Sequence, residues 1–405
     1  MTRFRYGYIT APIIGFLWAF TIAILVAVIM SFISGDLFKP SLTFSLVNGV
    51  FVGLTLLYLK ANKRLILMGL TLLIFLISYF GFGAVFIGEQ VSIQNRMVTS
   101  LLIALAIILP INIMLTDLNF GALTRHDFEH AIIKFLTWFG YLFFTFIVVI
   151  PFYVMLMTSL KSQQALLANP LDFSIEFSKG WALFRSYIEL FRDFNFGQYL
   201  SMSLMISVLT VFITLLFSVP GAYAIARLRF KGRAAMSRSI LLIYMVPMIV
   251  LALPIYIAFS TVGLRNSVVG ILLIYPVTTV PVALYMLQGY FRGLPAEIEE
   301  AGLMDGLSRL AVIWKITLPL SLPALASVSL YVFMISWNEF LLAFMLLDDP
   351  SKFTLTRGVA MLNSSEIPRQ HLMAGAVVAT IPIMIIFLGL ERFMTKGLTA
   401  GSVKG

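Results

Sequence analysis

Ten stretches of this sequence are apolar over roughly 18 to 25 residues, the length of a helix that crosses the hydrocarbon core of a membrane. Inside a bilayer every backbone polar group needs a partner within the chain, so such runs fold as helices. Hydrophobic residues make up 60% of the chain and charged residues only 11%, which excludes a soluble globular protein. The runs lie near residues 9–33, 42–59, 65–88, 98–116, 138–160, 197–219, 239–260, 267–290, 322–347 and 372–391. The sequence therefore predicts an all-α polytopic membrane protein with about ten transmembrane helices.

The basic residues indicate the orientation of these helices. The net charge is +10, and the Lys and Arg residues lie between the apolar runs, so membrane orientation explains them better than nucleic-acid binding. With the amino terminus in the cytoplasm, 18 of the 28 Lys and Arg residues are cytoplasmic, including the cluster Arg227, Arg229, Lys231, Arg233 and Arg238. We therefore expect both termini in the cytoplasm. The first apolar run is too long for a signal peptide and is expected to be retained.

A polar segment at residues 295–319 has the pattern of two short helices. Pro295 suits the first turn of a helix, and one face then holds Ile298, Ala301, Gly302 and Asp305. Gly306 breaks this helix, and a second amphipathic run follows until Pro319 removes a backbone donor and ends it. The apolar stripe of that run holds Leu310, Ile313, Trp314 and Thr317. The residues alone leave two interpretations open: a docking surface with charge from Glu299, Glu300 and Asp305, or an ordinary amphipathic loop on the bilayer.

This segment resembles the EAA loop of the permease subunits of binding-protein-dependent ABC importers. The family pattern is roughly Glu-Ala-Ala, three residues, Gly, nine residues and Ile-x-Leu-Pro. The residues that match it are Glu300, Ala301, Gly306, Ile316, Leu318 and Pro319. Two positions depart from the pattern, because Gly302 replaces the second alanine and Leu307 follows the turn glycine. Glycine at position 302 costs about 1 kcal/mol of helix stability relative to alanine.

Further motifs extend the resemblance over residues 138–405. Residues 221–233 resemble the exit of the second core helix and its basic loop, and Ser336–Phe340 resembles the W-N-E-F of the fifth core helix. Residues 396–405 resemble the tail of carbohydrate importers related to the maltose-permease G subunit. The chain is thus identified as a carbohydrate ABC importer permease. We expect a six-helix type I importer core at 138–405, a cytoplasmic linker at 117–137 and an extension of about four transmembrane helices at 1–116.

The resemblance implies a multi-pass subunit of the prokaryotic cytoplasmic membrane that works within a complex. The expected partners are a dimer of ABC ATPases, a second, homologous permease subunit, an extracytoplasmic solute-binding protein, a carbohydrate and membrane lipid, with no nucleic acid. The chain has no G-x-x-x-x-G-K-[ST] sequence that could hold phosphates, so ATP and Mg are expected on the ATPase. We expect no cofactor or metal on this chain and no enzymatic activity.

The resemblance also assigns roles to individual residues. Those expected to couple to the ATPase are Glu299, Glu300, Ala301, Gly302, Asp305, Gly306, Leu307 and Pro319. Candidates for a second ATPase contact are Gly397, Thr399 and Gly401, with a frayed terminus as the alternative.

Trp337, Asn338 and Glu339 are expected inside the ninth span, where a carboxylate must be paired, hydrated or facing a cavity. These three residues are candidates either for the transport pathway or for a hydrogen-bonded contact with the partner permease.

Two other functions stay open at this stage. A permease of the same superfamily for a non-sugar solute would share the loop but not the sugar-type tail at 396–405. A gradient-driven carrier is disfavoured, because such carriers tend to bury Asp, Glu, Arg and Lys residues as relays and the apolar runs here hold few of them. The identity of the carbohydrate is left open, since the binding protein and the other permease subunit can also select it.

Overall fold

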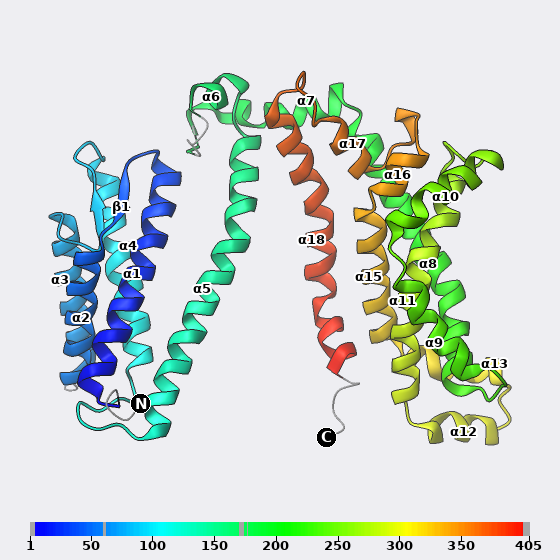
Figure 1. Cartoon of the computed structure of the whole chain (residues 1–405), viewed down its shortest axis with the longest axis horizontal. Helices are drawn as coiled ribbons and strands as arrows, with labels where there is room; N and C mark the ends of the chain where they lie inside the picture. Colours follow the sequence, from blue (N-terminus) through cyan, green and yellow to red (C-terminus); the bar gives the residue numbers. More distant parts are fainter. Residues whose placement is uncertain (1–4, 60–61, 170–173, 176, 400–405) are drawn as a thin grey trace. The chain divides into compact units, whose positions relative to one another are not determined.

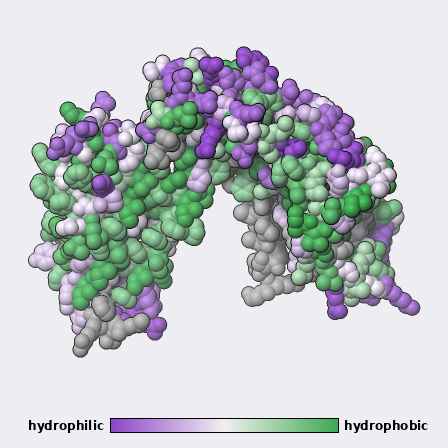
Figure 2. All heavy atoms as spheres, turned by 45° about the horizontal axis from the view of Figure 1, so that its top comes forward, coloured by the Kyte–Doolittle hydropathy of each residue, from purple (hydrophilic) through white to green (hydrophobic). Residues whose placement is uncertain are grey.

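The computed structural model describes residues 5–59, 62–169, 174–175 and 177–399 (Figure 1). The chain folds into two compact units, residues 1–183 and 184–405. Helices dominate both units, and hydrophilic residues gather mostly at the helix ends while the sides of the helices are largely apolar (Figure 2). This distribution is the one a bilayer imposes, and it agrees with the predicted all-α polytopic membrane fold.

The first unit contains five long helices and one small sheet. The helices are α1 (Gly7–Ser34), α2 (Leu42–Tyr58), α3 (Lys63–Tyr79), α4 (Ile93–Met114) and α5 (Arg125–Ser159). Strands β1 (Phe38–Pro40) and β2 (Val85–Ile87) pair antiparallel between them, and the short helices α6 (Gln163–Ala168) and η2 (Phe177–Phe184) follow α5. Hydroxyl side chains at Ser41, Ser92 and Thr124 accept hydrogen bonds from the first-turn amides of α2, α4 and α5, which explains where these helices begin.

Glycines allow α1 and α2 to touch through their backbones. A Cβ atom on Gly15 would lie 2.2 Å from the carbonyl oxygen of Gly49, and a Cβ on Gly49 would lie 2.4 Å from that of Gly15. Gly53, one helical turn beyond Gly49, faces the carbonyl of Ala11 in the same way. The spacing of Gly49 and Gly53 is the small-xxx-small pattern by which membrane helices approach closely and gain dispersion contacts.

Helix α5 packs with the first unit. The rings of Trp18 on α1 and Phe135 on α5 lie 6.4 Å apart edge to face, and Lys134 donates to the carboxylate of Asp117 at 2.6 Å. The predicted boundary near residue 137 falls within this continuous helix, because residues 125–137, expected as part of a linker, extend the fifth span by several turns. By its contacts α5 belongs to the first unit, and the division into an extension of about four spans and a six-helix core at 138–405 stays a prediction.

The second unit holds the remaining helices around two apolar clusters. Its long helices are α8 (Phe196–Arg227), α11 (Val268–Gly293), α15 (Leu322–Asn338) and α18 (Arg369–Thr399). The shorter elements are α7 (Arg185–Asp193), α9 (Arg233–Tyr244), α10 (Met248–Thr261), α12 (Ala296–Met304), α13 (Arg309–Val312), η3 (Ile313–Thr317), α14 (Leu318–Leu320), α16 (Leu341–Leu346), η4 (Pro350–Lys352) and α17 (Leu355–Met361). One cluster, which includes Trp337, lies between α7, α8, α11 and α15–α18, and the other, which includes Phe291, lies between α8, α11 and α15.

Each of the ten predicted spans contains a helix, but the third, at 65–88, is helical only in part, because α3 ends at Tyr79 and Val85–Ile87 form β2. Among the residues that the structure describes, six helices, α1, α4, α5, α8, α11 and the apolar part of α18, are long and apolar enough to cross a membrane alone. Three other runs fold as helices of 17 residues or fewer: α2, α3 and the pair α9 and α10. The ninth run is α15, which continues from the segment Arg309–Leu320 through a bend of 76°.

We expect Gly49→Ala to weaken the first unit, because the added Cβ meets the backbone of α1, which cannot move aside as a side chain can. Overpacking of this kind costs about 1–3 kcal/mol. The measurement is the fraction of detergent-solubilised chain that stays monodisperse after heating. Gly69→Ala on α3 is the matched control, because a Cβ there meets nothing within 4 Å. Equal thermal loss in the two variants would contradict the close α1–α2 contact.

Candidate functional site

The polar segment after α11 forms the predicted helix, turn and second helix, at the end of the second unit where α11 ends (Figure 1). Helix α12 follows Pro295, and Gly306 turns the chain with φ +85°, a left-handed conformation that favours glycine. The hydroxyl of Ser308 then accepts from the amide of Ala311 and caps α13. The prediction of a helix broken at Gly306 is confirmed.

The second helix differs from the prediction at its end. Pro319 does not stop it, because the backbone stays helical through η3 and α14 to Leu320 and bends at Ser321 instead. Proline has no N–H to bond to the carbonyl four residues earlier. The turn before it, Ile313–Thr317, is a π-helix, which uses the wider i to i+5 hydrogen-bond spacing. A single helical arm of residues 309–320 therefore leads into α15.

The carboxylate of Glu299 lies inside the loop. Its Oε2 accepts from the hydroxyl of Tyr223 on α8 at 3.1 Å, and its Oε1 accepts from the hydroxyl of Thr317 on η3 at 2.9 Å. The guanidinium Nε of Arg227 lies 3.5 Å from Oε1, and its Nη2 donates to the carbonyl of Leu294 at 2.7 Å. The Glu299 side chain is only 11% exposed. Glu299 thus ties three elements together, whereas the sequence predicted that it offers charge to a partner.

Gly302 lies on the same inward face and sets how closely α12 meets the second helix. A Cβ there would lie 2.5 Å from Cδ1 of Ile316 and 3.4 Å from Cγ2 of Val312. The nearest atom is the end of a flexible side chain, so an alanine requires only that Ile316 turn aside. This explains how the loop can hold glycine where the related pattern has alanine.

The loop exposes both large apolar and charged side chains. Met304, Leu310 and Trp314 are 88%, 70% and 71% exposed, and we call these three residues the apolar patch. Glu300 and Asp305 are also exposed. Met304 was not predicted as a site residue, and Leu310 and Trp314 were predicted only as a stripe together with Thr317, which is buried. Their spacing of four residues was the available signal.

The remaining predicted coupling residues divide between the two faces of the loop. Ala301, Gly306 and Pro319 are exposed with the apolar patch. Leu307 is half-buried, and its amide donates to the carbonyl of Gly302, which closes the turn.

Trp337 and Glu339 make their contacts within the second unit. Trp337 is 1% exposed, and its indole N–H donates to the carbonyl of Ala379 on α18 at 3.0 Å. Glu339 lies just past the end of α15, at the break before α16, instead of inside a span. Its carboxylate accepts from the amides of Leu342 and Ala343 at 2.7 and 3.0 Å, and from the hydroxyl of Tyr275 at 2.9 Å. Glu339 therefore caps α16 and ties it to α11.

Asn338 is the exposed member of this motif. Its amide nitrogen donates to the carbonyl of Met334 one turn earlier. In the predicted tail, Gly397 and Thr399 belong to the last turn of α18, and Gly401 lies outside the described residues.

Comparison with known proteins supports the family resemblance seen in the sequence. Residues 218–399 match the family described as binding-protein-dependent transport system inner membrane component. The inner membrane ABC transporter permease protein YcjP of Escherichia coli is 37% identical over 270 residues, which cover 66% of this chain and 95% of that protein. The chain belongs to this permease family. It is a multi-pass inner-membrane transport subunit, and the prediction of its family is confirmed.

Other relatives align with a similar share of this permease. The trehalose/maltose transport system permease protein MalG of Thermococcus litoralis is 32% identical over 281 residues, covering 68% of this chain and 99% of that protein. The crystal structure of a bacterial ABC transporter involved in the import of the acidic polysaccharide alginate aligns with a TM-score of 0.55 at 25% identity, over 67% of this chain and 98% of that one. About a third of this permease has no counterpart in these proteins.

We expect Glu299→Ala to loosen the loop of this permease, since Tyr223, Thr317 and Arg227 would lose their shared acceptor. Leaving buried donors unsatisfied costs about 1–3 kcal/mol. The measurement is hydrogen exchange of the amides at 296–320, which should become faster. Glu297→Ala, two residues away and exposed, is the control. Unchanged exchange in Glu299→Ala would show that this carboxylate does not hold the loop.

Proposed function

We propose that this permease is one of two membrane-spanning subunits of an ATP-driven carbohydrate importer, and that its loop at 296–320 is the surface on which an ABC ATPase docks. The observation that carries the proposal is the apolar patch of Met304, Leu310 and Trp314. A water-facing loop rarely exposes three large apolar side chains together unless another protein covers them. The exposed carboxylates of Glu300 and Asp305 add charge that Arg or Lys of the ATPase would pair with.

The contacts of Glu299 would let the docked loop move the membrane helices. Closure of the ATPase dimer around ATP pushes on α12 and the apolar patch. Because the Glu299 carboxylate bonds to Tyr223 on α8 and Thr317 on η3, the push reaches α8 directly and α15 through the bend at Ser321. ATP binding favours one state of the permease only by its differential affinity for the two states. ATP and Mg would be held by the ATPase, since this sequence has no phosphate-binding loop of its own.

The nature of the substrate rests on the relatives. Permeases named for trehalose or maltose and for arabinooligosaccharides are similar to this chain, and the aligned structure belongs to an importer of a polysaccharide. The sugar-type tail at 396–405 points the same way. A carbohydrate delivered by an extracytoplasmic binding protein is therefore the proposed substrate, with both termini and the loop on the cytoplasmic side.

The W-N-E-F motif would serve mainly as a brace in this mechanism. The indole of Trp337 donates to α18, and the carboxylate of Glu339 accepts from α11 and α16. Asn338, whose side chain is exposed, is the member placed to face the pathway or the second permease subunit. The tail that includes Gly397, Thr399 and Gly401 is proposed as a further ATPase contact.

We expect Trp314→Ala to release the ATPase while the permease stays folded, because the exposed indole makes up much of the apolar patch. Loss of a large aromatic anchor at an interface typically costs about 2 kcal/mol or more, a drop in affinity of at least about 30-fold. The measurement is the amount of ATPase that co-purifies with the tagged permease in mild detergent.

Trp181→Ala, at another highly exposed tryptophan, is the matched control for this experiment. Full ATPase recovery with Trp314→Ala would contradict docking at this loop. A complex that lacks any ATPase in the wild type, with transport retained after reconstitution, would favour a gradient-driven carrier.

Two further variants test the coupling itself. Glu300→Ala removes an exposed carboxylate, and Gly306→Pro replaces a residue at φ +85° with one restricted to about −65°. We expect both chains to reach the membrane, and we expect ATP hydrolysis by the complex to continue without sugar uptake. Parallel assays of hydrolysis and radiolabelled sugar uptake in proteoliposomes check this, and normal uptake in both variants would contradict the coupling role.

A further inference from the structure

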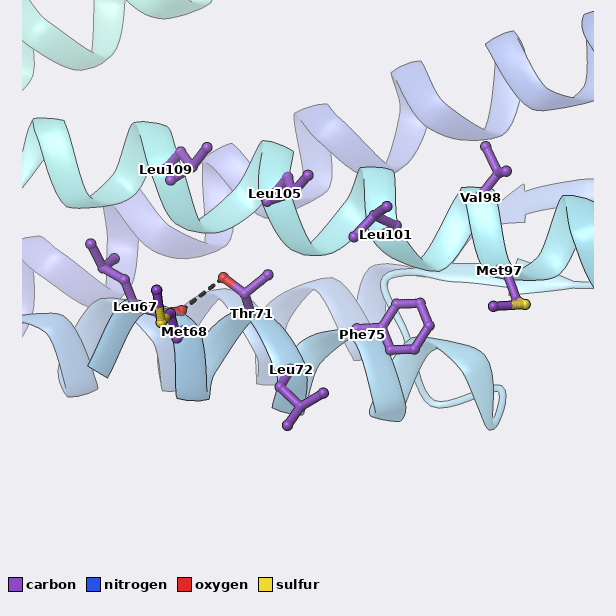
Figure 3. Close-up of a pocket in the computed structure, with 10 residues that line it drawn as sticks. All are labelled: Leu67, Met68, Thr71, Leu72, Phe75, Met97, Val98, Leu101, Leu105 and Leu109. Carbon is purple, nitrogen blue, oxygen red and sulfur yellow. Dashed lines mark hydrogen bonds between the residues drawn. The ribbon is translucent and has the colours of Figure 1, made fainter. Parts of the chain in front are cut away.

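An apolar groove of about 700 Å³ runs between α3 and α4 in the first unit (Figure 3). Leu67, Thr71 and Phe75 line it from α3, and Leu101, Leu105 and Leu109 line it from α4. Thr71 is the one polar residue of its lining, and its hydroxyl donates to the carbonyl of Leu67 at 2.7 Å. The groove therefore offers almost only hydrocarbon to whatever fills it.

A separate polar recess lies about one helical turn beyond one end of the groove. On α3, Lys63 precedes Leu67 by four residues and lies on the same helical row one turn away. On α4, Asn112 follows Leu109 by one turn, and Thr116 follows Asn112 by four residues. Lys63, Asn112 and Thr116 line a second cavity of about 180 Å³. An ammonium group, an amide and a hydroxyl thus lie about one helical turn beyond the apolar groove.

The positive charge at this end is available to a ligand. Lys63 and Arg64 are both exposed, and neither forms an ion pair with any residue that the structure describes. The carboxylate of Asp117, which feels the charge of Lys63, is engaged by Lys134 at 2.6 Å. The hydrogen bond and charge of Lys134, with a smaller contribution from Lys63, hold the pKa of Asp117 below its usual range, so the Asp117–Lys134 pair persists at neutral pH. At the far end of the groove, Arg96 donates to the carbonyl of Gly88.

We propose that this groove binds an anionic phospholipid, with an acyl chain along α3 and α4 and the phosphate against Lys63 and Arg64. The volume lies within the range of about 300–1,000 Å³ of sites that enclose small ligands. A spanning helix, at about 10 Å across and about 30 Å long, occupies on the order of 2,400 Å³ and does not fit within it. Basic recesses between transmembrane helices are suited to anionic head groups.

The test uses the full chain with whatever subunits co-purify, in micelles that contain equal amounts of a palmitoyl-oleoyl phosphatidylglycerol and the matching phosphatidylcholine. Native mass spectrometry counts the lipids that stay bound. We expect the wild type to retain the anionic lipid preferentially. In the Lys63→Ala, Arg64→Ala double variant, the preference for the anionic lipid should fall about fivefold for each cation removed. This is the effect expected for about 1 kcal/mol per basic residue. Lys39→Ala, which removes one exposed lysine on β1, is the control for loss of a positive charge elsewhere and should change nothing.

A second arm tests the apolar part of the site. Leu105→Trp fills the groove and should reduce retention of both lipids, whereas Leu46→Trp, at an exposed position on α2, should not. An anionic lipid with a photoreactive group on its acyl chain should crosslink to peptides of α3 and α4. Should the double variant fail to fold, Lys63→Arg with Arg64→Lys keeps the charge and must keep the preference. Equal retention of the two lipids by the wild type, or crosslinks confined to other helices, would overturn the proposal.

Discussion

Every backbone polar group of this permease that lies in the bilayer needs a partner within the protein, and this constraint explains where its helices break. Long uninterrupted helices satisfy it by themselves. Where a helix ends, polar side chains bond to the backbone groups that have no partner within the helix. Glu339 accepts the first amides of α16, and the left-handed Asn266 accepts the amides of Asp348 and Asp349 with its side-chain oxygen. The π-turn before Pro319 accommodates the missing amide of that proline without ending the helix.

The same principle holds the loop at 296–320 together from its inner side. Here a buried carboxylate, Glu299, bonds to two hydroxyls that belong to different helices, and a glycine, Gly302, lets the two arms pack closely. The inward face is thus satisfied within the chain, and the outward face exposes apolar and acidic side chains.

The first unit follows different packing rules from the loop. Its tightest contact is made by glycines on α1 and α2. Because lipid is as apolar as the side chains, burial gives no hydrophobic gain in the membrane, and close dispersion contacts stabilise the helix pair instead. Between α3 and α4 the packing is looser, and an apolar groove with a basic end is left. About a third of the chain has no counterpart in the relatives compared, so a lipid site there would be an addition to the common permease fold.

The sequence by itself determined where most of the apolar helices lie, the turn at Gly306 and the family, because these depend on local length, hydropathy and backbone freedom. Only the tertiary structure decided which way the polar side chains point. Glu299 and Glu339 find hydroxyl partners 76 and 64 residues away along the chain, and α5 packs with the first unit. A periodic pattern fixes which face of a helix is apolar, but the donor that meets a buried carboxylate is chosen by how distant helices pack together.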